Sequence, residues 1–241
     1  MAGGIVLTVL GVLLTPHMLS LMNTPEATMG DAVLYLRIYF GALTFTFIYN
    51  MGASILRAAG NSRTPLYYLI VCCLTNIVLD ILLVAGLDMG VAGAAIATFI
   101  SQALSAVLIT IRLAIDRGPL RITWKRMRFT GSILVSQLKL GIPTAVESVL
   151  FAITNIAIQA ALNTFGTDTA AAWSAFGKMD AVFWMVSTSF GIAITSFVGQ
   201  NHGAGKRERV KKSTKICLLM DFAVSAVIVI VLVALRTPLF R

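Results

Sequence analysis

The sequence predicts an all-α polytopic membrane protein with seven transmembrane helices. Of its 241 residues, 58% are hydrophobic and only 12% are charged, whereas soluble domains carry about 25% charged residues. A helix that crosses a bilayer needs about 20 mostly apolar residues. Segments that meet this requirement lie at residues 4–22, 33–56, 65–86, 90–114, 133–163, 169–199 and 214–235.

The junctions between these segments carry charges in an alternating pattern. Most Lys and Arg residues fall within 57–63, 112–128 and 206–215, whereas the intervening junctions hold acidic residues and no basic ones. The positive-inside rule therefore places loops 57–64, 112–130 and 202–213 in the cytoplasm, with Arg236 and Arg241 as exceptions. We expect a multi-pass protein of the plasma (bacterial inner) membrane.

The same loops explain the net charge of +9, so no nucleic-acid partner is expected. The cysteines Cys72, Cys73 and Cys217 lie inside apolar segments, where they are interpreted as small membrane hydrophobes and not as metal ligands. The sequence has no clustered catalytic set and no pattern of metal ligands. We therefore predict a protein that is not an enzyme, with the lipid bilayer as its surroundings and no cofactor.

The two ends of the chain resemble each other. The runs VLGVLLTPHML (9–19) and VIVLVALRTPLF (229–240) both close an apolar segment with Thr-Pro, at Thr15–Pro16 and Thr237–Pro238. If these positions are equivalent, the repeating unit has six helices. The chain would then be a window from a longer protein.

Five ordered motifs point to one family. They are YLRIYFGALTFTFIYNMGASILRAAGNSRTP (35–65), NIVLDILLV (76–84), GVAGAAIATFISQ (90–102), LKLGIPTAVESVLFAITNIAIQAALNTFG (138–166) and ITSFVGQNHGAGKRERVKKS (194–213). Together they cover most of the chain, which resembles the multidrug and toxic compound extrusion (MATE) family.

The resemblance implies a fold of twelve helices in two bundles, with the seven segments corresponding to helices three to nine. Residues 1–115 would then be the end of the first bundle, 116–130 a basic cytoplasmic linker and 131–241 the start of the second. It implies a cation-coupled antiporter that takes in H⁺ or Na⁺ and exports cationic or amphipathic toxic compounds. We expect a monomer.

Ionisable residues within the apolar segments are the main functional candidates, because burying a charge in the membrane is costly. Lys178 and Asp180 interrupt the apolar run WSAFGKMDAVFW, and Glu147 interrupts the preceding segment. Residues two apart on a helix point to different faces, so we expect Glu147 to be the partner of Lys178. The group is either an ion-coupling site or a structural salt bridge. In other MATE branches the acidic residue lies about one turn further on, at the position of Phe151.

Polar side chains at helical spacing extend the list of candidates. Asn155, Gln159 and Asn163 share one face of the fifth segment with Glu147, and Asn76 and Asp80 form a second pair four residues apart. Each set lines either an aqueous cavity or a hydrogen-bonded helix interface. Asp221 is a further ionisable residue, in the middle of the last segment.

Aromatic residues of the sixth segment, Phe176, Phe183 and Trp184, follow helical spacing. Such faces hold cationic drugs through cation–π contacts, although helix packing explains the same stripe. The alternative function is a lipid-linked oligosaccharide or polysaccharide flippase of the same superfamily. A flippase would need several arginines in its cavity, whereas the segments considered offer mainly acidic residues and one lysine.

Overall fold

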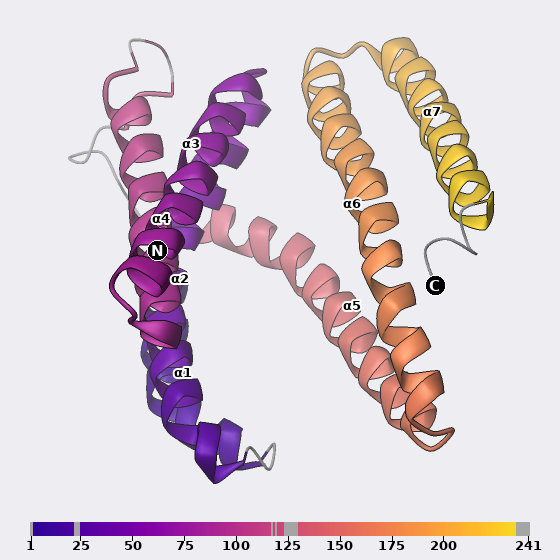
Figure 1. Ribbon diagram of the computed structural model, residues 1–241. Coiled ribbons are helices and arrows are strands. Elements are labelled where there is room, and N and C mark those ends of the chain that lie inside the picture. Colours follow the sequence, from indigo (N-terminus) through magenta and orange to yellow (C-terminus); the bar gives the residue numbers. More distant parts are fainter. Residues whose placement is uncertain (1, 22–24, 117, 119, 123–129, 235–241) are drawn as a thin grey trace. The chain divides into compact units, whose positions relative to one another are not determined.

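A computed structural model describes residues 2–21, 25–116, 118, 120–122 and 130–234, which form helices joined by short turns (Figure 1). The chain divides into two units, residues 1–123 and 124–241. Each described segment that was expected to span the membrane is helical and is long and apolar enough to do so. The chain is therefore a multi-pass membrane protein.

The first unit consists of a bundle of helices: α1 (Ala2–Leu21), α2 (Glu26–Ala58), α3 (Arg63–Asp80), η1 (Ile81–Gly86) and α4 (Gly90–Ala114). α2 packs against α1 and α4, and α3 packs against α4. The core of the unit is formed by Leu56, Ile109 and Leu113, which are almost completely buried. Leu120 and Ile122, from the chain after α4, pack against this core.

Small residues let the helices of this unit approach each other closely. A Cβ atom built at Gly52 of α2 would lie 2.6 Å from Cγ1 of Ile109 in α4, and one built at Gly11 of α1 would overlap the ring of Phe40. Close packing at small residues is the usual way in which helices associate in a membrane, where burial against lipid provides no driving force.

The predicted third segment is not one continuous α-helix. The α-helical part ends at Asp80, and residues Ile81–Gly86 form a π-helix. Short π-helical stretches within membrane helices are rare and frequently mark functional sites. The hydrophobic pattern of residues 65–86 gives no sign of this change.

The loops after α2 and α6 end their helices in the same way. Gly60, at φ +90°, donates its N–H to the carbonyl of Arg57, and Asn61 donates to Leu56. Gly205, at φ +71°, takes the corresponding position after α6. This is a Schellman motif, in which glycine adopts the left-handed conformation at low cost. The sequence GAGK (203–206) is therefore a helix cap.

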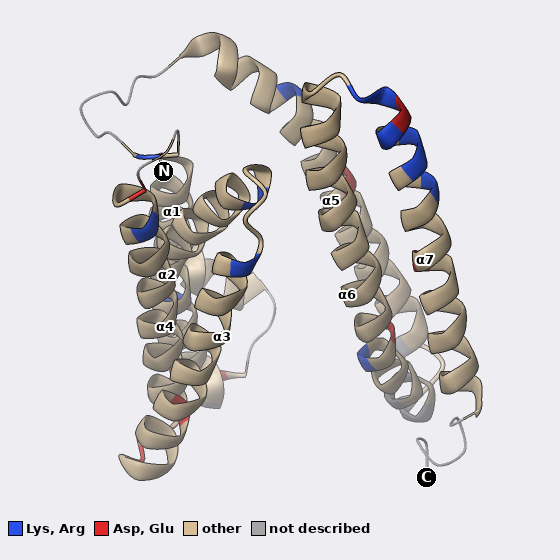
Figure 2. Ribbon diagram, turned by 90° about the horizontal axis from the view of Figure 1, so that it is seen from above, with Lys and Arg blue, Asp and Glu red and all other residues tan. Residues whose placement is uncertain are grey.

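The second unit contains α5 (Gly131–Asn163), α6 (Thr167–Gly203) and α7 (Arg207–Ala234). α6 packs against α7, and α5 meets α6 across the turn at Gly166, where φ is +98°. Basic residues occupy much of the first turns of α7, where the ribbon is blue in Figure 2. Thr237–Pro238, half of the proposed internal match, lies outside the described residues; Thr15 is fully buried and donates to Gly11.

Candidate functional site

A small polar cavity lies between α2, α3 and α4 of the first unit. Its volume is about 150 Å³. Leu69, Cys72 and Cys73 line part of it, and the rest of the lining is polar: Tyr49, Asn76, Thr98, Ser101, Gln102 and Ser105. Polar side chains are expensive to place within a membrane helix bundle, so a cluster of this kind identifies a functional candidate.

Most hydroxyl groups of this cavity donate within the protein. The Tyr49 hydroxyl donates to the carbonyl oxygen of Pro65 at 2.9 Å, which ties α2 to the start of α3. Thr98, Ser101 and Ser105 each donate to a carbonyl of α4 three or four residues earlier. The hydroxyl hydrogens of these residues are therefore engaged. Each hydroxyl oxygen can still accept a hydrogen bond or bind a cation.

Asn76 and Asp80 differ from these groups. They lie one turn apart on α3, and Asn76 lines the cavity. Nδ2 of Asn76 and Oδ1 of Asp80 are buried, and neither has a hydrogen-bond partner in the part of the chain that the structure describes. A buried polar atom left without a partner costs about 1–3 kcal/mol, and more when it is charged. The Asp80 carboxyl is therefore a candidate ligand-binding group.

The π-helix η1 begins directly after Asp80. Its backbone is held against α4, because a Cβ atom built at Gly93 would lie 3.0 Å from the carbonyl carbon of Leu83 and 3.1 Å from its oxygen. The π-helix η1 and Gly93 thus hold the end of α3 against α4. The carboxyl of Asp80 is held at the point where the backbone geometry changes.

The chemistry available at this site is the binding of a small cation or a proton. The cavity lining offers amide and hydroxyl oxygens, and the Asp80 carboxyl lies one turn along α3 from Asn76. These are hard oxygen ligands of the kind that alkali and alkaline-earth cations prefer. A proton on Asp80 would instead convert an acceptor into a donor. No group of three or more potential metal-binding His, Cys, Asp or Glu side chains occurs among the described residues.

The second unit contains the charged residues first singled out from the sequence. The rings of Phe151 in α5 and Trp184 in α6 meet edge to face, with centroids 5.9 Å apart. This contact joins the two antiparallel helices, and Asn155 and Asp180 each lie four residues nearer the turn than the aromatic residue of their own helix.

The structure does not join Glu147 to Lys178 in the expected ion pair. Glu147 is exposed, and no ion pair joins it to Lys178 in the described chain. The expectation was wrong because the depth of a residue along its own helix does not determine which side chains meet between two helices.

The polar stripe of α5 is only partly described. Nδ2 of Asn155 donates to the Phe151 carbonyl at 2.9 Å, within its own helix, and the side chain is exposed. Gln159 is half-buried and has an interaction of its own. The side chain of Asn163 lies outside the described part of the structure.

The aromatic candidates of α6 form two separate groups. Trp184 contacts both Phe151 and Phe183, the latter at a centroid distance of 6.2 Å. Phe176 instead packs against Trp173, at 5.3 Å. Trp184 and Phe176 are about half exposed, at 50% and 48%. The two groups therefore lie at different levels of the helix.

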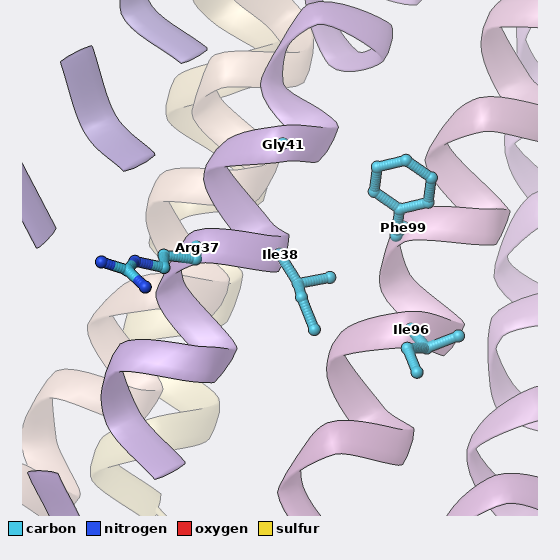
Figure 3. Close-up of a pocket in the computed structure, with 5 residues that line it drawn as sticks. All are labelled: Arg37, Ile38, Gly41, Ile96 and Phe99. Carbon is cyan, nitrogen blue, oxygen red and sulfur yellow. The ribbon is translucent and has the colours of Figure 1, made fainter. Parts of the chain in front are cut away.

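Arg37 is a candidate that the sequence analysis missed. It lies inside α2 at a second cavity of about 390 Å³, which Gly41, Ile38, Ile96 and Phe99 also line. Figure 3 shows the three apolar side chains between α2 and α4, with the guanidinium of Arg37 directed away from Phe99. The signal was present in YLRIYFG (35–41), where one arginine interrupts an apolar run.

Comparisons with known proteins give a consistent result. The MatE family model matches residues 1–82 and 143–241. The chain is 31% identical over 236 residues to a protein of Bacillus subtilis (strain 168) named "Probable multidrug resistance protein YoeA", covering 95% of this chain and 51% of that protein. It is 33% identical over 201 residues to "Probable multidrug resistance protein YpnP" of the same organism, covering 83% and 44%.

Solved structures share the fold. A structure titled "Outward-facing conformation of a multidrug resistance MATE family transporter of the MOP superfamily" matches with a TM-score of 0.90 and 20% identity, over 98% of this chain and 53% of that one. The chain thus spans about half the length of the relatives that it matches.

Proposed function

The chain belongs to the MATE family, and from this premise we propose that it acts in a cation-coupled antiporter of the bacterial plasma membrane. In this proposal H⁺ or Na⁺ enters while cationic or amphipathic toxic compounds leave, and loops 57–64, 112–130 and 202–213 face the cytoplasm. The protein is a transporter and not an enzyme. Relatives named as multidrug resistance proteins support the class of substrate.

One observation carries the coupling part of the proposal: the unpartnered Asn76 Nδ2 and Asp80 Oδ1 beside a polar cavity. An antiporter needs a group that binds its ion in one state and releases it in another. A buried carboxyl has two such states, because burial favours its neutral form and a bound cation favours its charged form. Asp80 is therefore the group that we assign to ion coupling, with Asn76 as its neighbour.

Lys178 and Asp180 are assigned a second role in the same proposal. Asp180 and Asn155 each lie one turn from the Phe151–Trp184 contact on their own helix, and with Trp184 and Phe183 they would offer a charged, an amide and an aromatic group to a cationic substrate. Cation–π contacts contribute about 0.5–2 kcal/mol each. Glu147 and the remaining polar residues of α5 are kept as contributors to a water-accessible surface.

The flippase alternative receives less support. A lipid-linked pyrophosphate calls for several arginines, because bidentate Arg–phosphate contacts provide both charge and geometry. Arg37 is the one basic residue at the 390 Å³ cavity, and its guanidinium is directed away from the apolar lining. Transport of a lipid-linked sugar by proteoliposomes, with no efflux of cations, would favour this alternative.

The test is ethidium efflux from cells that express the full-length protein from its chromosomal gene. Asp80→Asn removes the titratable carboxyl with little change in shape, and we expect it to abolish most ion-driven efflux at matched membrane abundance. Asp88→Asn is the control, because Asp88 is exposed and has a φ of +53° that asparagine also tolerates. Imposed Na⁺ and H⁺ gradients, applied separately, identify the ion.

The same assay tests Asp180→Asn and Lys178→Met. We expect both to weaken efflux of cationic substrates while leaving the ion dependence unchanged. Wild-type efflux by Asp80→Asn would refute the coupling site in the first unit. No efflux of any cation by the wild-type protein would refute the antiporter itself.

A further inference from the structure

A polar contact joins the last two helices of the second unit. The Ser187 hydroxyl of α6 donates to Oδ2 of Asp221 in α7, at 3.2 Å. The other carboxyl oxygen, Oδ1, is buried and has no hydrogen-bond partner among the described residues. The interface thus holds a carboxyl group with one oxygen satisfied and the other not.

Both residues lie near the middle of their helices, Ser187 within Thr167–Gly203 and Asp221 within Arg207–Ala234. The surrounding chain is apolar, as in ICLLMDFAVSAV (216–227). Each helix is long enough to span the membrane. The carboxyl of Asp221 therefore lies at the depth where an unpaired charge costs most.

No ion pair joins a cationic side chain to this carboxyl in the part of the chain that the structure describes. α6 is the element that packs against α7 in the described chain. Its ionisable residues on the outer side are Asp180 and Lys178, about 10 and 14 Å from Ser187 along the axis, and His202 lies about 22 Å away on the other side. On α7, Lys215 is about 9 Å from Asp221, and the Cys217 thiol lies 3.8 Å from the Phe190 carbonyl.

The contact offers too few oxygen atoms for a divalent metal cation. The contact supplies two carboxyl oxygens and one hydroxyl oxygen, whereas hard divalent cations take six or more oxygen ligands. A proton needs one oxygen atom only. Protonation also removes the negative charge, which is the larger part of the cost of burying the group.

We propose that Asp221 is a proton-binding site at the α6–α7 interface. One proton from water binds Oδ1 and neutralises the carboxyl, while Ser187 continues to donate to Oδ2. Loss of that proton leaves a carboxylate whose Oδ1 has no donor, which favours entry of water between α6 and α7. This site is additional to Asp80. A role of the site in transport rests on the proposed antiport, whereas the binding of a proton by Asp221 does not depend on that proposal.

The test is infrared difference spectroscopy of the protein in lipid vesicles, between acidic and alkaline buffers. In a variant that carries Asp80→Asn, so that the other buried carboxyl contributes nothing, we expect a protonated-carboxyl C=O band that disappears when Asp221→Asn is added. Ser187→Ala removes the hydrogen bond to Oδ2, so the band should shift in frequency without being lost. Asp88→Asn, on the exposed turn, should leave the band unchanged.

Two results would overturn the proposal. The first is a band that survives when Asp221→Asn is added. The second is a band that appears only when Na⁺ is replaced by choline, because that would make the occupant a metal cation. If Asp221→Asn does not fold, Ser187→Ala decides, since an unshifted band excludes Asp221 as its source. Failure of the antiporter proposal appears as missing efflux and leaves this spectrum unaffected, so the two failures are distinguishable.

Discussion

Gly93 of α4 lies directly against the backbone of Leu83 in the π-helical segment. A Cβ atom built at Gly93 would be 3.0 Å from the Leu83 carbonyl carbon and 3.1 Å from its Cβ. The backbone of η1 has no flexible end that could move aside. The glycine is therefore what allows the π-helix, and with it Asp80, to lie against α4.

Gly93→Ala is expected to destabilise the first unit by about 1–3 kcal/mol, the usual cost of overpacking. The measurement is the midpoint of thermal unfolding of the detergent-purified protein. Ion-driven efflux should fall as well, because the displaced backbone carries Asp80.

Gly30→Ala provides the matched control for this substitution. Gly30 is also helical, but nothing lies within 4 Å of a Cβ built there. Alanine should be neutral or stabilising at that position, because a helical glycine costs about 0.5–1 kcal/mol relative to alanine. Equal midpoints for Gly93→Ala and Gly30→Ala would show that the contact with Leu83 is unimportant.

Gly52 and Ile109 make the corresponding contact between α2 and α4. A Cβ at Gly52 would lie 2.6 Å from Cγ1 of Ile109, whose side chain is fully buried and has no free space to move into. We expect Gly52→Ala and Ile109→Ala each to lower stability, the first by about 1–3 kcal/mol and the second by about 2–5 kcal/mol. The double variant should lose less stability than the sum of the two single losses, because the effects of substitutions at contacting residues are not additive. Additive effects would argue against this contact.

Tyr49 couples α2 to α3 through its hydroxyl, which donates to the Pro65 carbonyl at 2.9 Å. Tyr49→Phe removes this hydrogen bond and preserves the ring. We expect a loss of about 0.5–1.5 kcal/mol in the free energy of unfolding, measured by thermal or denaturant unfolding. Tyr67→Phe, at an exposed position on α3, is the control and should change nothing.

The sequence was sufficient to predict the spans, because each apolar run is long and bounded by turn residues. It was not sufficient to predict the π-helix after Asp80, since ILLVAG (81–86) has the same composition as its α-helical neighbours. The bulge depends on a contact with Gly93, a residue of another helix. Local patterns do not contain that information.

The candidate site residues were likewise predicted only in part. Asn76 and Asp80 were paired from their spacing alone, because four residues make one helical turn. The partner of Lys178 was assigned wrongly, since the depth of a residue along its own helix does not determine which side chains meet between α5 and α6. Arg37 was missed although it interrupts an apolar run in the same way as Lys178.

The contact between Phe151 and Trp184 makes a direct prediction for cross-linking. Their ring centroids lie 5.9 Å apart, whereas no ion pair joins Glu147 to Lys178 in the described chain. In a variant without its native cysteines, a short bifunctional maleimide should join Phe151→Cys to Trp184→Cys. It should join Glu147→Cys to Lys178→Cys far less, as measured by peptide mass after digestion. A reversed preference would restore the pairing of Glu147 with Lys178 and would argue against the contact between the two aromatic residues.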